Sequence, residues 1–155
     1  MMTTASEHKI DKVEKMAGGK GHVIIEHLLG EAELDGKCGL YAKVTIEPGC
    51  TLGFHEHHGE TETYYILSGE GSYNDGEKSF PVKTGDVTFC PDGSGHALDN
   101  TGDTDLVFMA LISSDKRVMG KFKSGRVTKV LIWVTVGIVS VLTAVLLVMQ
   151  VFGIG

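Results

Sequence analysis

Three histidines and one glutamate are the residues of this chain whose types and spacing best suit metal chemistry. His55 and His57 lie two residues apart in an extended segment, where residues i and i+2 point to the same side of a strand. Glu62 begins the next extended run, and His96 lies much farther along the chain. Three imidazoles and a carboxylate would suit one divalent transition-metal ion, such as manganese, iron, nickel or zinc, with positions left open for water or substrate.

The segments that must position these residues read as short β-strands separated by turns. Residues 40–46 alternate between apolar and polar side chains, which is typical of a half-buried strand. Only residues 31–34 could form one helical turn between 22 and 113. Many short strands with Gly-, Pro- and Asn-containing turns predict an all-β sandwich or barrel. The predicted strands are 22–29, 40–46, 51–57, 63–67, 71–73, 78–82, 86–90, 95–98 and 106–112.

The four candidate ligands are embedded in two regular patterns of glycine, proline and asparagine. The first pattern, G(X)5HXH(X)4E(X)6G, runs from Gly49 to Gly69. The second, G(X)5PXG(X)2H(X)3N, runs from Gly85 to Asn100. These are the two motifs of the cupin superfamily, and the sequence resembles that family at every specified position. The 15 residues between the motifs are typical of a compact, single-domain bacterial cupin.

The resemblance implies a jelly-roll barrel, or double-stranded β-helix, of the "cupin 2" conserved-barrel type. It also implies that His55, His57, Glu62 and His96 are metal ligands inside that barrel, whereas the motif glycines, the motif proline and Asn100 shape the backbone. Cupins of this kind usually pair, so the resemblance further implies a homodimer. Dimerisation would cover sheet edges that otherwise invite aggregation.

The charges divide the chain into an acidic body and a short basic segment. Residues 1–115 hold all 20 acidic residues and 8 basic ones, a net charge of −12 with histidine neutral. The remaining 6 basic residues lie between 116 and 129. The acidic body argues against nucleic-acid binding, because it would repel a phosphate backbone.

A run of 23 uncharged residues, 130–152, follows the basic segment. As a helix it would be roughly 34 Å long and apolar all round, which matches the ~30 Å hydrocarbon core of a lipid bilayer. Basic residues concentrate on the cytoplasmic side of a membrane span. We therefore expect a single-pass membrane protein with a cytoplasmic cupin domain and its C-terminus outside. The expected divisions are an N-terminal extension (1–21), the cupin β-barrel (22–113), a basic juxtamembrane linker (114–129) and one transmembrane helix (130–152).

The other metal-ligating residue types have no partners at useful spacing. The three cysteines show no CxxC pattern; three histidines lie outside both motifs, and His58 occupies a position that the first motif does not specify. In a reducing cytoplasm the cysteines are expected to be free thiols. We interpret all seven as structural: Cys38, Cys50, Cys90, His8, His22, His27 and His58.

The remaining pocket residues leave two functions open. Tyr64 shares the inward face of Glu62 and could act as a catalytic acid or hydrogen-bond donor, or equally be a packed aromatic. No arginine occurs before Arg117, which favours a small neutral ligand over an oxalate-type or phosphosugar ligand. One hypothesis is a metal-dependent enzyme of the oxygenase, isomerase or lyase type acting on a small molecule. The other is a non-catalytic small-molecule-binding or sensor module tethered to the membrane.

Overall fold

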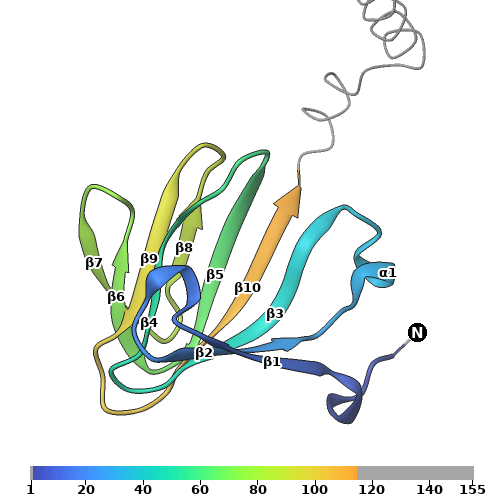
Figure 1. The fold of residues 1–155 in the computed structure, drawn as a ribbon, viewed down its shortest axis with the longest axis horizontal. Helices are drawn as coiled ribbons and strands as arrows, with labels where there is room; N and C mark the ends of the chain where they lie inside the picture. Colours follow the sequence, from blue (N-terminus) through green and yellow to red (C-terminus); the bar gives the residue numbers. More distant parts are fainter. Residues whose placement is uncertain (1, 115–155) are drawn as a thin grey trace, which may run out of the picture. The chain divides into compact units, whose positions relative to one another are not determined.

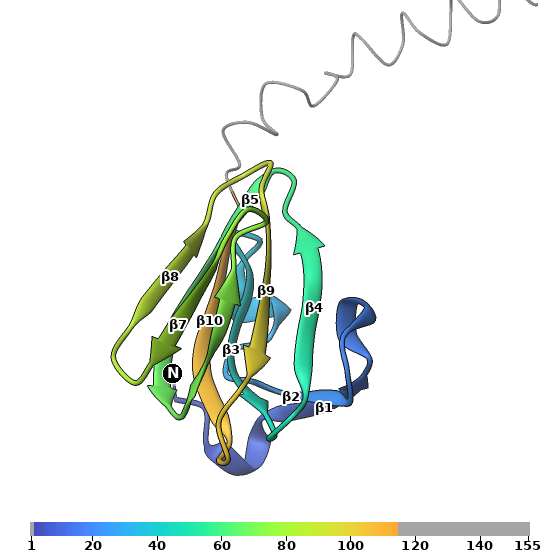
Figure 2. The same ribbon diagram turned by 90° about the vertical axis from the view of Figure 1, so that its left-hand side faces the viewer.

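The computed structural model describes residues 2–114, which form two antiparallel β-sheets that face each other (Figures 1 and 2). The larger sheet consists, in spatial order, of β1 (Lys9–Glu14), β2 (His22–His27), β3 (Cys38–Ile46), β10 (Leu106–Ser114), β5 (Glu60–Ser68) and β8 (Val87–Cys90). The smaller sheet consists of β4 (Thr51–Glu56), β9 (Gly95–Asn100), β6 (Glu70–Asn74) and β7 (Ser79–Lys83). The short helical elements are η1 (Ala5–Glu7), η2 (Met16–Gly18) and α1 (Glu31–Leu34).

The chain passes repeatedly from one sheet to the other between β3 and β10. Apart from the β6–β7 hairpin, each successive strand joins the opposite sheet, which is how a jelly roll is built. The last strand, β10, inserts between β3 and β5, so that Phe108 lies opposite both Val44 and Ile66. This pairing joins the beginning and the end of the predicted barrel segment, and the all-β barrel prediction is confirmed.

The core lies between the two sheets and follows the alternation expected from the sequence. On β3, Ala42, Val44 and Ile46 are buried, whereas Tyr41 is exposed. Both sheets contribute to one apolar cluster, which provides a rigid wall around any site inside the barrel. The buried apolar residues of this cluster are Val23, Ile25, Ala42, Val44, Ile46, Leu52, Tyr64, Ile66, Tyr73, Val82, Leu98, Leu106, Phe108 and Ala110.

All nine strands predicted from the sequence are confirmed, with ends shifted by a few residues. The single helical turn expected at 31–34 is α1. One further strand, β1, lies within residues 1–21, where we expected an extension outside the barrel. It pairs with β2 from Lys9 opposite His27 to Glu14 opposite His22.

Strand β1 could not be predicted from the sequence, because this edge strand is exposed or only half-buried at every position. A strand without a buried face has no reason to alternate between apolar and polar residues. Polar contacts hold it to β2 instead: Nε2 of His27 lies 2.9 Å from a carboxylate oxygen of Asp11, and Nδ1 of His8 lies 2.8 Å from Glu26. Two of the histidines interpreted as structural therefore fasten the N-terminal strand.

Within residues 2–114, no helix is long and apolar enough to cross a membrane. The predicted membrane span, 130–152, lies outside the described residues, as does the predicted linker beyond Ser114. The membrane topology expected from the sequence therefore stays a prediction.

Candidate metal centre

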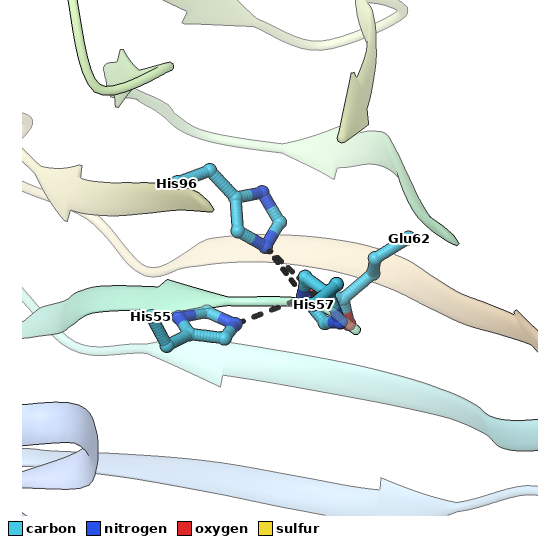
Figure 3. A group of neighbouring side chains, drawn as sticks. All are labelled: His55, His57, Glu62 and His96. Carbon is cyan, nitrogen blue, oxygen red and sulfur yellow. Dashed lines mark hydrogen bonds and ion pairs between the residues drawn. The ribbon is translucent and has the colours of Figure 1, made fainter. Parts of the chain in front are cut away.

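The four predicted ligands meet inside the barrel, although they come from three different strands and one loop (Figure 3). His55 lies on β4 directly opposite His96 of β9, and Glu62 lies on β5 of the other sheet. His57 follows β4, and its backbone is fixed by hydrogen bonds to Gly93 and Ser94 in the turn that precedes β9. The second motif thus positions ligands of both motifs.

The ligand atoms converge on the carboxylate of Glu62. One oxygen of Glu62 lies 2.8 Å from Nε2 of His96, 3.1 Å from Nε2 of His57 and 3.5 Å from Nε2 of His55. The Nε2 atoms of His57 and His96 are themselves only 3.1 Å apart. The four potential ligand atoms all lie within 4.8 Å of one another, so a single ion could contact all of them.

Each imidazole is held from behind through its other nitrogen. Nδ1 of His55 donates to the backbone oxygen of Gly53 at 3.0 Å, and Nδ1 of His57 lies 3.1 Å from the carboxylate of Glu60. Nδ1 of His96 lies 3.1 Å from the hydroxyl of Tyr73. A neutral imidazole that donates through Nδ1 carries a lone pair on Nε2, so with a metal ion bound the rings of His55 and His57 would present lone pairs to it.

Several lone pairs aimed at one buried point repel one another unless a cation or a proton lies between them. Burial alone would raise the pKa of Glu62, but hydrogen bonds from His55, His96 and Tyr64 outweigh it and lower the pKa to about 2. A hydrogen bond to Glu62 raises the pKa of His55, whereas burial lowers the pKa of His96. Near neutral pH the centre therefore holds an ionised carboxylate beside an imidazole that resists protonation, and these residues fit a divalent cation.

The ligands are not equally accessible to solvent. The side chains of His57, Glu62 and His96 are at most 4% exposed, whereas that of His55 is 25% exposed. Water or a small ligand can therefore reach the centre on the side of His55. A centre that is buried on three sides and open on one resembles catalytic and ligand-binding metal sites more than closed structural ones.

Tyr64, the predicted catalytic residue, lies against this centre and is fully buried. Its hydroxyl donates to Glu62 at 2.8 Å, and its ring stacks on His96 with 5.0 Å between the ring centres. Burial, followed by the charge of Glu62, raises the pKa of Tyr64 well above its usual value. Tyr64 therefore remains protonated and orients the carboxylate of Glu62. A direct role in catalysis stays a prediction.

Glu60 and Tyr73 are the site residues that we did not predict. Glu60 begins β5 and contacts His57. Its position three residues after His57 was the available signal, since a tight turn brings such residues together. Tyr73 left no signal, because only the pairing of β6 with β9 brings it to His96. Glu56, which lies between His55 and His57 in the sequence, points to solvent, with its side chain 60% exposed.

A surface hollow of about 430 Å³ lies beside the centre, where the edges of β7 and β8 face each other. Its lining includes Tyr73, which contacts His96, and Thr88, which lies opposite Tyr64 on the paired strands β8 and β5. The hydroxyl oxygen of Thr88 is buried and has no hydrogen-bond partner in the described part of the chain. The side chains of Tyr73 and Thr88 therefore lie between this hollow and the metal centre.

An antiparallel jelly roll with three imidazoles and one carboxylate converging inside it defines a class: small β-barrel proteins with an internal cluster of side chains that could hold a metal ion. Residues 42–112 match the family of cupin domains. An oxalate-binding protein from Thermotoga maritima is 44% identical over 112 residues, which are 72% of this chain and 93% of that protein. The chain belongs to the cupin family.

Two further similarities agree with this assignment. The crystal structure of a predicted oxalate decarboxylase from Thermotoga maritima has a TM-score of 0.71 and 43% identity, and the match covers 74% of this chain and 100% of that one. Oxalate decarboxylase from Bacillus subtilis is 35% identical over 79 residues, which are 48% of this chain and 20% of that enzyme. The similarity to that enzyme therefore concerns one portion of it.

Proposed function

We propose that this cupin binds one divalent transition-metal ion through His55, His57, Glu62 and His96, and holds a small carboxylate ligand of the oxalate type beside it. The observation that carries the proposal is the convergence of four ligand atoms whose rings are fixed from behind. When bound, such an ion supplies the positive charge and Lewis acidity that attract a carboxylate. The name of the Thermotoga maritima relative, an oxalate-binding protein, supports the choice of ligand.

The absence of arginine before Arg117, which led us to expect a neutral ligand, does not count against oxalate at a metal centre. A divalent ion provides the positive charge that an arginine would otherwise contribute. The ligand would reach the ion on the side of His55, the ligand side chain that is 25% exposed.

A metal-dependent enzyme of the oxygenase, isomerase or lyase type is the second candidate, and the similarity to oxalate decarboxylase favours the lyase. In that case Tyr64 holds a proton at its hydroxyl and shares it with Glu62, 2.8 Å away. Its high pKa makes it a hydrogen-bond donor to Glu62 rather than a base. A binding module without turnover needs only the metal ion and an open position beside it.

The first test is metal analysis of the full chain, purified in detergent without added metal or chelator. We expect His57→Ala and His96→Ala each to lower the bound metal by about one equivalent per chain, with unchanged circular dichroism. The matched control is His58→Ala, because His58 adjoins His57 but is exposed to solvent. Unchanged metal content in both ligand variants would contradict the proposed site.

Calorimetric titration with oxalate then tests the ligand. The metal-loaded protein should bind oxalate, whereas the metal-free protein should not, and acetate should bind more weakly because it has only one carboxylate. Release of formate or carbon dioxide during incubation with oxalate would favour the enzyme, and binding without release would favour the binding or sensor module. Equal weak binding of oxalate and acetate would contradict an oxalate-type ligand.

We also propose that residues 130–152 anchor the cupin domain to the cytoplasmic face of a membrane, with the basic segment 116–129 near anionic headgroups. Deleting residues 130–152 should move the protein from the membrane fraction to the soluble fraction after cell lysis. A protein that is already in the soluble fraction with its full chain would overturn the anchor.

A homodimer is a further proposal, supported by exposed apolar side chains on the outer face of the larger sheet. Tyr65 lies opposite Val87, and Thr63 lies opposite Phe89 and Leu111 on the flanking strands. Val87 is 63% and Phe89 59% exposed, which is high for large apolar residues. We call Tyr65, Val87, Phe89 and Leu111 the outer apolar patch, and we propose that a second copy of the chain covers it.

A further inference from the structure

A second group of potential metal ligands lies outside the barrel centre, at the junction of β2, β3 and β4. It consists of His22, the first residue of β2, together with Glu47 and Cys50 in the loop that joins β3 to β4. Their potential ligand atoms all lie within 4.8 Å of one another. Cys50 lies five residues before His55, which is roughly 16 Å along an extended strand, so this group is separate from the barrel centre.

The backbone holds the three side chains in place without any ligand. Val23 lies opposite Ile46 in the β2–β3 ladder, which brings the next residues, His22 and Glu47, side by side. Glu47 and Cys50 are the first and last residues of a tight turn, closed by a 3.0 Å hydrogen bond from the Cys50 nitrogen to the Glu47 oxygen. A site framed in this way loses little conformational entropy when it binds an ion.

The turn itself is fixed from the barrel side by Asn100. The backbone nitrogen of Asn100 donates to the oxygen of Cys50 at 3.2 Å, and its side-chain amide donates to the oxygen of Ile46 at 2.7 Å. These two bonds lie on either side of the Glu47 to Cys50 turn. Both the carboxylate and the thiol therefore project from a constrained segment.

The imidazole of His22 has an unsatisfied nitrogen that points into this group. Its Nε2 atom is buried and forms no hydrogen bond within the described residues. It lies 3.0 Å from a carboxylate oxygen of Glu47, close enough for an ion pair but without hydrogen-bond geometry. An unpartnered buried nitrogen beside a carboxylate is unfavourable, and a cation bound between the two would satisfy both.

The thiol of Cys50 occupies space that only a glycine leaves free. A Cβ atom at Gly21 would lie 2.4 Å from the sulfur of Cys50, and Gly21 has a positive φ of 67° that suits glycine. The residue next to His22 therefore allows the sulfur to reach the imidazole and the carboxylate.

We propose that His22, Glu47 and Cys50 form a second metal site that binds Zn²⁺ or a similar borderline-soft divalent ion. Nitrogen, oxygen and thiolate sulfur are the ligands that zinc takes in proteins, and their bond lengths of about 2.0–2.3 Å place tetrahedral ligand atoms roughly 3.3–3.8 Å apart. On binding, the sulfur–zinc bond replaces the sulfur–hydrogen bond of the thiol, and the proton passes to solvent. Glu47 is 46% exposed, so the fourth position faces water.

The test uses Co²⁺ as a spectroscopic substitute for Zn²⁺, because a cobalt–thiolate bond produces a charge-transfer absorption that imidazole and carboxylate ligands do not. The full chain in detergent is freed of metal and titrated with Co²⁺, and each complex is then displaced with Zn²⁺. We expect the thiolate band in the wild type, its loss in Cys50→Ser, and its retention in Cys38→Ser, since Cys38 is a half-buried free thiol outside the group.

The zinc titration is expected to show two equivalents per chain in the wild type. Cys50→Ser and His22→Gln should weaken one equivalent by at least about tenfold, whereas His96→Ala should affect the other. Absence of a thiolate band in the wild type, or a band that persists in Cys50→Ser, would overturn the second site. The thiolate band does not depend on the barrel centre. Failure of the proposed barrel site can therefore be distinguished from failure of the proposed second site.

Discussion

At the scale of single residues, the barrel centre depends on the groups that hold the ligands as much as on the ligands. Gly53, Glu60 and Tyr73 each contact the outer nitrogen of one imidazole. Such contacts fix the ring orientation and the protonation state, so that the inner nitrogens face the centre. Of the three, only Glu60 carries a side-chain charge.

Glu60→Ala should reduce the affinity for the barrel metal about 10–100-fold while the protein stays folded. The variant removes the carboxylate 3.1 Å from Nδ1 of His57, and the ring then loses its orientation. Competition with a chromophoric chelator measures the change. Glu56→Ala is the matched control, because Glu56 is a neighbouring glutamate that points to solvent. Equal affinities of the two variants would show that Glu60 does not position His57.

Ionised Glu62 should make the metal-free protein lose stability in acid. Its pKa in the folded state is about 2, below the reference value of 4.5, so its contribution is present above pH 4.5 and is lost as the pH falls towards 2. The loss should be on the order of 1–3 kcal/mol. Urea unfolding at pH 6 and pH 3 measures it, with Glu62→Gln as the reference in which this loss is absent. The same pH dependence in both proteins would contradict the assignment.

At the scale of elements, the motif glycines are required for different physical reasons. Gly69, between β5 and β6, has a φ of 84°, and a Cβ atom there would lie 2.5 Å from the backbone oxygen of Asp105. Gly85 has a similar φ of 92°, but nothing lies within 4 Å of a Cβ atom at that position. One glycine is therefore needed for conformation and space, and the other for conformation alone.

Gly69→Ala should destabilise the fold by several kcal/mol, and Gly85→Ala by about 1 kcal/mol. Both variants impose the cost of a positive φ on alanine, but only the first also pushes β5 and β6 away from the backbone before β10. Free energies of unfolding from urea titration separate the two costs. Equal losses would mean that the close contact at Gly69 relaxes freely.

At the scale of the whole molecule, the outer apolar patch and the membrane anchor concern how the protein associates. Phe89→Glu should convert the proposed dimer to a monomer, because a charge in a paired apolar surface is costly to bury. Light scattering of the protein in detergent, corrected for the micelle, measures the mass. Ile10→Glu is the control, because Ile10 is 61% exposed on β1, away from the patch. A dimer that survives Phe89→Glu would place the interface elsewhere.

Local patterns along the chain were enough to predict the strands of the barrel and the four residues that converge inside it. A period of two assigns residues to one face of a strand, so His55 and His57 could be placed on the same side from spacing alone. The two glycine patterns then related them to Glu62 and His96. The strand alternation and the motif spacings are local patterns, and they can be recognised without knowing which strands pair.

The groups that surround those ligands could not be predicted, because they depend on which strands pair and in which register. Tyr73 reaches His96 because β6 pairs with β9, and His22 reaches Cys50 because the β2–β3 ladder and a tight turn bring them together. The spacing of these residues along the chain follows no strand or helix periodicity. Their contacts depend on strand register instead. We interpreted His22 and Cys50 as structural because neither has a partner at a useful spacing along the chain; their partners lie across strands, which register alone determines.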